Sequence, residues 1–267
     1  MATYPIKHWS YSSLMSYLRN PLAWYKRYVE NIRDMPSTPS SIVGRAGHVA
    51  LQHYYSGTGK EIATKIGLDY LKDFPDFEIE FGKNVTRAAQ KKKRASMERE
   101  YLQAVGFYLA RAPRYKKILG VEVVGLATVP GLPLPLKAIS DLVVEPRVGD
   151  GVDIIDHKFV DSFSTMKGEK PLFILQALFN YYTIKEEFKQ EPRRFILQEC
   201  KKRANADGRS QMRRYIIEYQ DCAEELAVFH RLIIDATNDL ARRKVFLPNP
   251  SDMFEGPNSY DIYRLGL

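Results

Sequence analysis

The sequence predicts an α/β domain with a helical N-terminal part. Apolar residues recur every three or four positions through most of the first third of the chain, which is the period of an amphipathic helix. Near Gly120 the pattern changes to short β-branched or apolar runs separated by Pro and Gly turns, and helical and strand-like segments then alternate. No linker is long enough to require two independent domains. We therefore expect one domain over residues 1–267, divided into a mainly helical part (1–118), an α/β core (119–245) and a C-terminal tail (246–267).

Composition excludes several classes of protein. The chain has 267 residues, of which 45% are hydrophobic, so it can bury a core and is not globally disordered. No apolar stretch approaches the roughly 20 residues of a membrane-spanning helix, and the N-terminus lacks the apolar centre of a signal peptide, so we expect no membrane partner. With only Cys200 and Cys222, a disulfide framework or four-thiolate cluster within one chain is excluded, and a reducing cytoplasm is expected. The net charge of +8 favours phosphate-bearing partners, but only weakly.

Periodicity and end signals define the expected helices. In the first, three leucines and a tyrosine are spaced by four, four and three residues and so share one face. A serine at position 10, 12 or 13 caps its start, and Asn20-Pro21 breaks it into two pieces. The last helix is expected to be capped by Asp221. The expected helices span residues 11–29, 42–55, 61–71, 86–110, 171–188 and 221–244.

Five strands are expected after Gly120. The first three form a meander whose turns contain Pro130-Gly131 and the Pro/Gly-rich stretch 146–151. The other two follow the helix at 171–188 and flank a basic loop with an Asp207-Gly208 turn. The expected strands span residues 121–129, 134–145, 152–159, 193–200 and 213–219.

The hairpin around the turn 146–151 brings two carboxylates together. If the hairpin is symmetric about this turn, Glu145 pairs with Val152, and the same register sets Asp141 opposite Asp156. Cβ atoms of directly opposed residues lie roughly 4.5–5.5 Å apart, so two carboxylates there repel each other unless a cation lies between them. A cross-strand salt bridge or a solvent-facing end of the sheet is the structural alternative, and a bulge would break the register.

Lys158 and Glu122 extend this pair toward magnesium chemistry. Residues two apart in a strand share a face, so Asp156 and Lys158 point the same way, at the end of a strand that begins apolar. A hard divalent cation takes one or two carboxylates together with water and phosphate oxygens, and a nearby ammonium stabilises developing negative charge. Glu122, on the preceding strand, is placed to supply a third acid; otherwise it is an ordinary exposed strand glutamate.

In their order, these residues resemble the RecB-like branch of the PD-(D/E)XK nuclease superfamily. That branch has a serine-rich N-terminal helix, a G-x-x-x-H helix, a glutamate, an aspartate, a D-x-K strand and a helix that opens with Gln. Each motif is common alone, but the ordered set, which covers about residues 10–190, is much less so. The matching residues are Ser10-Tyr11-Ser12-Ser13-Leu14, Gly44-Arg45-Ala46-Gly47-His48, Glu122, Asp141, Asp156-His157-Lys158 and Gln176.

The resemblance implies a fold and a metal site. The fold is a restriction-endonuclease-like core, a central mixed sheet flanked by helices, with Gly44 and His48 on the helical N-terminal part. The metal is Mg2+ or Mn2+, as one or two ions, and an imidazole ligand favours the softer ion somewhat. The implied metal ligands are Asp141, Asp156 and the backbone carbonyl of His157, with His48 and Glu122 completing or extending the shell.

The resemblance also implies roles for the remaining residues. Lys158 acts on the attacking water or on the charge of the transition state, and Gln176 supports the site and faces DNA. The His157 side chain is expected on the opposite face of the sheet and is not a ligand. Two structural alternatives stay open: His48 as a core histidine of an amphipathic helix, and Gly44 as a residue that merely permits close helix packing.

The sequence departs from the family pattern at two places. The family usually has Tyr four residues after the helix Gln, but here this position is Asn180, which leaves the contribution of a tyrosine in doubt. Some members carry an iron–sulfur cluster with one Cys before the N-terminal proline and three near the C-terminus. Here Asn20 precedes Pro21 and the tail has no Cys, so we expect no such cluster.

A metal-dependent DNA exonuclease, acting on linear duplex ends or single strands in recombination, repair or phage DNA processing, is therefore expected. The alternatives are a structure-specific endonuclease and a non-hydrolytic DNA-binding recombination subunit. A homo-oligomer and a single-strand-annealing or recombination partner also fit the resemblance, in a bacterial or phage-infected cytoplasm. The best candidates for contacts to DNA phosphates lie around the hairpin loop, namely Lys201, Lys202, Arg203, Arg209, Arg213 and Arg214.

Overall fold

The central element of the computed structural model is one mixed sheet, and the structure describes residues 4–32, 36–84, 86–164, 173–207 and 210–249. The strands follow the order β1-β3-β4-β5-β6, with β2 on the other edge of β3. β1 runs parallel to β3 and β5 parallel to β4, while the other pairs are antiparallel. The strands are β1 (Trp9–Ser10), β2 (Ile118–Ala127), β3 (Leu136–Val144), β4 (Val152–Val160), β5 (Pro192–Lys201) and β6 (Met212–Glu218).

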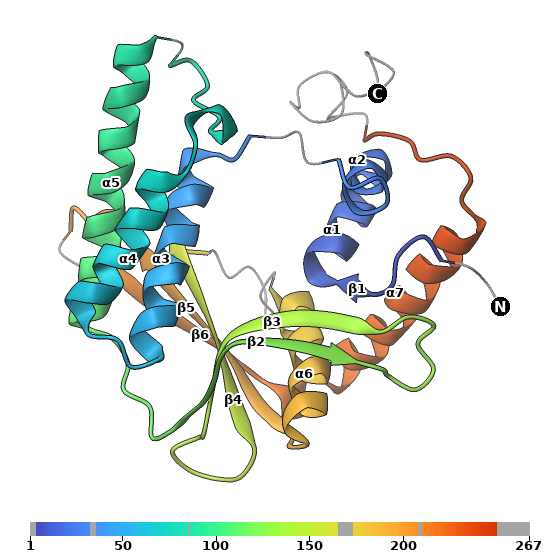
Figure 1. Cartoon of the computed structure of the whole chain (residues 1–267). Coiled ribbons are helices and arrows are strands. Elements are labelled where there is room, and N and C mark those ends of the chain that lie inside the picture. The colour runs from blue at the N-terminus through green and yellow to red at the C-terminus, as the bar shows by residue number, and fades with distance from the viewer. Residues whose placement is uncertain (1–3, 33–35, 85, 165–172, 208–209, 250–267) are drawn as a thin grey trace.

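Helices flank the sheet in two groups (Figure 1). α3, α4 and α5 gather on one side of the molecule, and α1, α2 and α7 on the other, with α6 against the sheet. Short 3-10 turns occur at Asp76–Glu78 and Tyr219–Asp221. The helices are α1 (Tyr11–Arg19), α2 (Pro21–Tyr28), α3 (Pro39–Tyr55), α4 (Lys60–Asp73), α5 (Arg87–Ala110), α6 (Ile174–Phe188) and α7 (Ala223–Arg242).

Both faces of the sheet are buried around β4, whose residues alternate between two cores. Ile155 packs in the core formed with α3 and α5, and Ile154 in the core formed with α6. A third core, which contains Trp9 and Trp24, joins the N-terminal helices to α6 and α7. Alternate residues of β4 therefore belong to different layers of the molecule, which decides where Asp156 and His157 point.

The N-terminal helices begin and end where the sequence predicts. Ser10 is the N-cap of α1, since its Oγ accepts a hydrogen bond from Ser13 N at 3.2 Å. Asn20 ends α1 and caps α2, where its Oδ1 accepts from Ala23 N at 3.1 Å, and Pro21 occupies the first turn, where its missing N–H costs nothing.

One local prediction is wrong, and one short strand was not predicted. Asp221 does not cap α7: it lies in a 3-10 turn that Cys222 N closes on Tyr219 O at 3.1 Å, so α7 begins only at Ala223. The two-residue strand β1 was not predicted. It is recognised as a strand only because it pairs with β3, and a segment of two residues has no periodic pattern of its own. The helix expected from residue 171 begins at Ile174, and residues 171–172 lie outside the described residues.

The central mixed sheet flanked by helices, which the resemblance implies, is confirmed. Its crossover from β4 through α6 to β5 joins two parallel neighbouring strands, as in a β-α-β unit. Among the described helices, none is both long and apolar enough to cross a membrane.

Candidate metal centre

Asp141 lies where one edge of β3 is open. β2 pairs with β3 on one edge, so β1 and β4 share the other: β1 pairs at Leu136 and Lys137, and β4 pairs from Leu142 onward. Between these two pairings the edge has no partner strand. Here a side chain takes the place of a backbone acceptor between the strands: Asp141 Oδ2 accepts a hydrogen bond from the backbone N of His157 at 2.7 Å.

The predicted register of the hairpin is confirmed. The observed pairs are Leu142 with Ile155, Val143 with Ile154, and Val144 with Asp153. Continued by one residue, this register sets Asp141 opposite Asp156. The turn at 146–151 alone was enough to predict it, because no bulge occurs between the turn and the site.

Three side chains from three elements converge at this point of β3. His48 of α3, Glu122 of β2 and Asp141 of β3 place ligand atoms within 4.8 Å of one another. His48 Nδ1 lies 3.3 Å from Asp141 Oδ2. An octahedral Mg2+ has ligands at about 2.0–2.1 Å, so two ligands on opposite sides are about 4.2 Å apart. One imidazole nitrogen and two carboxylates at these separations therefore fit a divalent cation after small side-chain adjustments.

Close packing brings His48 to this point, and the glycine responsible is Gly47. A Cβ added at Gly47 would lie 2.3 Å from the Phe159 ring of β4, whereas one added at Gly44 would meet no atom within 4 Å. The interpretation of Gly44 as the residue that permits close packing is therefore wrong. α3 approaches the sheet one residue before the histidine.

Glu122 has a backbone conformation that side chains rarely adopt. Its φ is +50°, in the left-handed region, although it lies within β2. Its neighbours Val121 and Val123 pair with Leu142 and Ser140, so Glu122 lies opposite Asp141. A left-handed conformation costs a residue with a side chain about 1–2 kcal/mol, and such strain concentrates at functional sites. The pairing on both sides holds the Glu122 carboxylate beside Asp141.

Asp156 lies on the α6 face of β4, among groups that hold its carboxylate. It is 4% exposed. Its Oδ1 accepts from Gln176 Nε2 at 2.7 Å and from Lys158 Nζ at 3.2 Å. Its Oδ2 lies 2.8 Å from Lys158 Nζ but makes no hydrogen bond of ordinary geometry among the described residues. One buried carboxylate oxygen therefore remains available to a further ligand.

Negative charge exceeds positive charge at this centre. Burial raises the pKa of Asp156, and Asp141 raises it further, although Lys158 opposes both. Burial and the neighbouring Asp141 likewise raise the pKa of Glu122. Asp141 is the exception: burial would raise its pKa, but the charge and hydrogen bond of His48 outweigh burial and lower it. A divalent cation would relieve the repulsion among the three carboxylates.

His48 and His157 have opposite electrostatic environments. Burial would lower the pKa of His48, but the charge and hydrogen bond of Asp141 outweigh it and raise the pKa. Burial lowers the pKa of His157 to about 4. The His157 ring points away from Asp156, as predicted: it is parallel to Tyr55 at a centroid distance of 5.5 Å, and its Nδ1 lies 3.0 Å from the Tyr108 hydroxyl.

Two residues of the hydrogen-bond network around the candidate metal centre, Ser140 and Asn180, were not predicted to take part in it. Ser140 Oγ donates to Asn180 Oδ1 at 2.5 Å, and Asn180 Nδ2 donates to the backbone O of Gln176 at 2.8 Å. Asn180 therefore ties α6 to the residue beside Asp141, at the position where the family usually has tyrosine. A buried amide on an otherwise apolar helix face is the signal that could have identified it.

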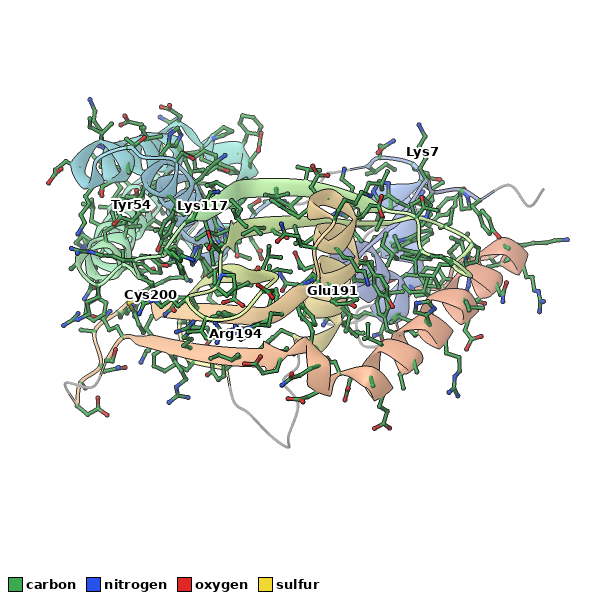
Figure 2. The ribbon with its side chains drawn as sticks, turned by 90° about the horizontal axis from the view of Figure 1, so that it is seen from below. Lys7, Tyr54, Lys117, Glu191, Arg194 and Cys200 are labelled. Carbon is green, nitrogen blue, oxygen red and sulfur yellow. The ribbon has the colours of Figure 1, made fainter. Side chains whose placement is uncertain are left out.

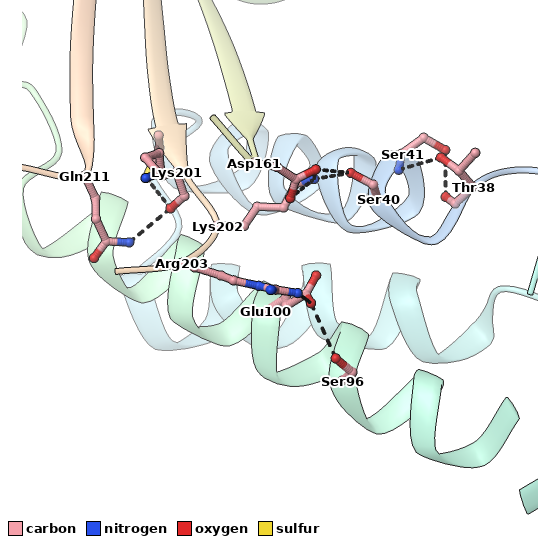
Figure 3. Close-up of polar contacts among 11 residues, drawn as sticks. Thr38, Ser40, Ser41, Ser96, Glu100, Asp161, Lys201, Lys202, Arg203 and Gln211 are labelled. Atoms are coloured by element: carbon pink, nitrogen blue, oxygen red, sulfur yellow. Dashed lines mark hydrogen bonds and ion pairs between the residues drawn. The ribbon is translucent and has the colours of Figure 1, made fainter. Parts of the chain in front are cut away.

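One lysine of the basic loop, Lys202, is buried. Lys202 is 2% exposed: its Nζ donates to Ser40 Oγ and lies 3.3 Å from both carboxylate oxygens of Asp161 (Figure 3). A DNA contact by Lys202 is therefore a wrong prediction, because the ammonium joins the end of β5 to α3. Arg203 pairs with Glu100 at 2.5 Å.

The other predicted DNA contacts are only partly brought together. Lys201 Nζ donates to Asn205 Oδ1 at 2.5 Å. The Arg213 guanidinium stacks over Phe163 at 4.7 Å, and Arg214 projects from the opposite face of β6. Arg209 lies outside the described residues. Lys201 Nζ lies 5.8 Å from the centroid of the same Phe163 ring, so among the described residues the structure brings Lys201 and Arg213 together and leaves Arg214 on the other face.

Similar proteins identify the family. The model of the PD-(D/E)XK nuclease superfamily matches residues 8–252, whereas no protein of curated function matches the chain. A solved structure from Eubacterium rectale, described as a "Putative exonuclease", is 13% identical with a TM-score of 0.53, over 98% of this chain and 94% of that one, which supports the fold alone. A second, SSO0001, is 14% identical over 84% and 81% of the chains, but its TM-score of 0.32 carries no argument. Because the family model spans most of its length, the chain belongs to the PD-(D/E)XK nuclease superfamily.

Proposed function

We propose that this nuclease is a divalent-metal-dependent DNA exonuclease of the RecB-like branch, which hydrolyses phosphodiester bonds at DNA ends. The observation that carries the proposal is the convergence of His48, Glu122 and Asp141 within 4.8 Å, beside the Asp156-Lys158 pair. The exonuclease assignment itself rests on the motif resemblance, and the Eubacterium rectale structure supports the fold that the assignment requires. A role in recombination, repair or phage DNA processing rests on the motif resemblance.

Each residue of the centre has a proposed role. His48, Glu122, Asp141 and Asp156 hold one or two Mg2+ or Mn2+ ions, together with the backbone carbonyl of His157. When bound, such an ion supplies Lewis acidity toward a phosphate oxygen and lowers the pKa of water. Lys158 is 39% exposed in its side chain, so it can reach the phosphate and stabilise negative charge that develops there.

Gln176 is a positioning residue in this proposal. Its amide donates to Asp156 Oδ1 at 2.7 Å, which leaves Oδ2 for the cation. Asn180 in turn accepts from Ser140 and fixes the same helix against β3. Together these contacts keep α6 and the two aspartate-bearing strands in one arrangement.

The proposed centre also supports a single domain. His48 comes from the helical part, residues 1–118, while the carboxylates and Lys158 come from the core, residues 119–245. Neither part holds the full set of ligands. In the tail, Phe246 stacks on Tyr25 with centroids 4.5 Å apart, and residues 250–267 lie outside the described residues.

Incubation of end-labelled linear duplex and covalently closed circular DNA with the protein tests the proposal. With Mg2+ or Mn2+ we expect loss of label from the linear substrate, intact circles, and no reaction in chelator. Asp156→Asn and Lys158→Ala abolish cleavage while leaving DNA binding and the fold intact, and the exposed Lys65→Ala serves as the control. Cut circles would favour a structure-specific endonuclease. DNA binding in chelator without product under any ion would favour a non-hydrolytic subunit.

A further inference from the structure

A cationic cavity lies on the face of the sheet opposite Asp156. Its volume is about 340 Å3, near the lower end of the roughly 300–1,000 Å3 of ligand pockets. Val144, Ile155 and Ile196 line it from β3, β4 and β5, all on the face that packs against α3 and α5. The segment 113–116, which follows α5, contributes further lining residues. The cavity shares no lining residue with the candidate metal centre.

Positive charge is concentrated in this cavity. Six cationic side chains and two carboxylates, Glu145 and Asp153, line it, which gives a formal net charge of +4. This is half of the +8 of the whole chain. Concentration of one sign of charge in a concave site attracts ligands of the opposite sign. The cationic residues are Arg114, Lys116, Arg147, Arg193, Arg194 and Arg214.

Some of these cationic side chains are paired with carboxylates of the protein, and others are available to a ligand. Asp153 is 3% exposed, and its carboxylate accepts hydrogen bonds from Arg194 Nε at 3.1 Å and Nη2 at 2.5 Å. These two bonds hold the guanidinium in place. Arg194 is labelled in Figure 2, which views the molecule from below. Lys116 pairs with Glu145. Within the described part of the chain, Arg114 and Arg214 form no ion pair with a carboxylate, so their charge is available to an anion.

Gln198 indicates that the ligand also has polar edges. It is 6% exposed and lines the cavity, yet its side-chain amide makes no hydrogen bond to any described residue. The amide atoms are not among the fully buried atoms that lack a partner, so they open onto the cavity and can hydrogen-bond to a ligand there. The amide offers one donor and one acceptor position, as the edge of a nucleobase requires. The Tyr115 ring lines the same cavity and provides a surface on which a planar base can stack.

We propose that this cavity binds a nucleotide, with its phosphate among the guanidinium groups and its base between Tyr115 and Gln198. The nucleotide is either a free mononucleotide or the phosphorylated end of a DNA strand. The proposal goes beyond the nuclease activity and does not depend on it, because the cavity and the metal centre share no residue. Binding can therefore be measured in chelator, where the metal centre is inactive.

Isothermal titration calorimetry of the full chain in EDTA tests the proposal. The probes are 5′-dAMP, adenosine, which has no phosphate, and a 5′-phosphorylated single-stranded pentanucleotide. The variants are Arg214→Ala and Gln198→Leu, and Arg231→Ala on α7, also an exposed arginine, is the matched control. Loss of one charge-assisted hydrogen bond or of the amide contact weakens binding about tenfold.

A free nucleotide is supported as the ligand if one 5′-dAMP binds saturably and adenosine, which has no phosphate, binds about tenfold more weakly or worse. The two cavity variants should weaken 5′-dAMP binding by the same factor, and Arg231→Ala should leave it unchanged. The same pattern for the pentanucleotide alone supports the strand end. Absence of binding for both phosphorylated probes overturns the proposal, as does equal affinity in all three variants. Arg214 is exposed, so its variant is expected to fold and to decide the question even if Gln198→Leu does not.

Discussion

Replacing Gly47 with alanine tests how α3 presents His48 to the metal centre. A Cβ at this position would lie 2.3 Å from Cε2 of Phe159, whereas carbon atoms in contact stay about 3.5–4.0 Å apart. The two groups must therefore separate by more than about 1 Å. Phe159 is 9% exposed and packs in the core beneath α3, so we expect the helix to move with the ring. Such a shift disrupts the 3.3 Å contact between His48 Nδ1 and Asp141 Oδ2.

The magnitude follows from two opposing terms. Overpacking a core costs about 1–3 kcal/mol, and alanine gains about 0.8–1 kcal/mol over glycine within a helix. We expect Gly47→Ala to lower the free energy of unfolding by up to about 2 kcal/mol and to weaken Mn2+ binding roughly 10- to 100-fold. Urea unfolding and a Mn2+ titration measure the two effects.

Gly44→Ala is the matched control, on the same helix three residues earlier. A Cβ there meets no atom within 4 Å, so only the helix term remains. We expect it to raise the free energy of unfolding by about 0.8–1 kcal/mol and to leave the Mn2+ affinity unchanged. If Gly47→Ala were as stable as Gly44→Ala and bound Mn2+ as the wild type does, the packing argument would be refuted.

Three further predictions concern protons and the surrounding contacts. The raised pKa of His48 favours its protonated form, whereas a metal needs the neutral imidazole, so Mn2+ binding should release protons and weaken as the pH falls. Calorimetry near neutral pH in buffers of different ionisation enthalpy counts the protons, and a count of zero would contradict this. Lys202→Ala should lower the free energy of unfolding by about 2–3 kcal/mol, because the packing of the buried side chain is lost. The salt dependence of DNA binding should stay the same. If the slope of log affinity against log salt concentration fell by about 1, Lys202 would contact a phosphate. Asn180→Leu leaves the hydroxyl of Ser140, which is 2% exposed, without its hydrogen-bond acceptor. Urea unfolding should therefore show a free energy of unfolding that is about 1–3 kcal/mol lower. Wild-type stability would contradict the role given to this contact.

Local signals were sufficient for the parts of the fold that local chemistry decides. Asn20-Pro21 ends one helix and starts the next through its own side chain and ring, so its position in the sequence fixes the break. The register of β3 and β4 follows from their short turn, which sets Asp141 opposite Asp156. Side-chain alternation then places His157 on the face opposite Asp156.

Features that depend on distant partners could not be predicted. The left-handed conformation of Glu122 is held by pairing on both sides of it, which no sequence pattern reports. Lys202 resembled a surface lysine in a basic run, but Asp161 and Ser40, far away in the chain, allow it to be buried. The choice between Gly44 and Gly47 depends on where Phe159 lies against α3.

Binding of Mn2+, followed by electron paramagnetic resonance, tests the central claim most directly. The wild type should bind Mn2+ saturably at the site built from His48, Glu122 and Asp141, and Asp141→Asn should lose this binding while its thermal unfolding shows an intact fold. Equal Mn2+ binding by the wild type and by Asp141→Asn, or no binding by the folded wild type, would contradict the account.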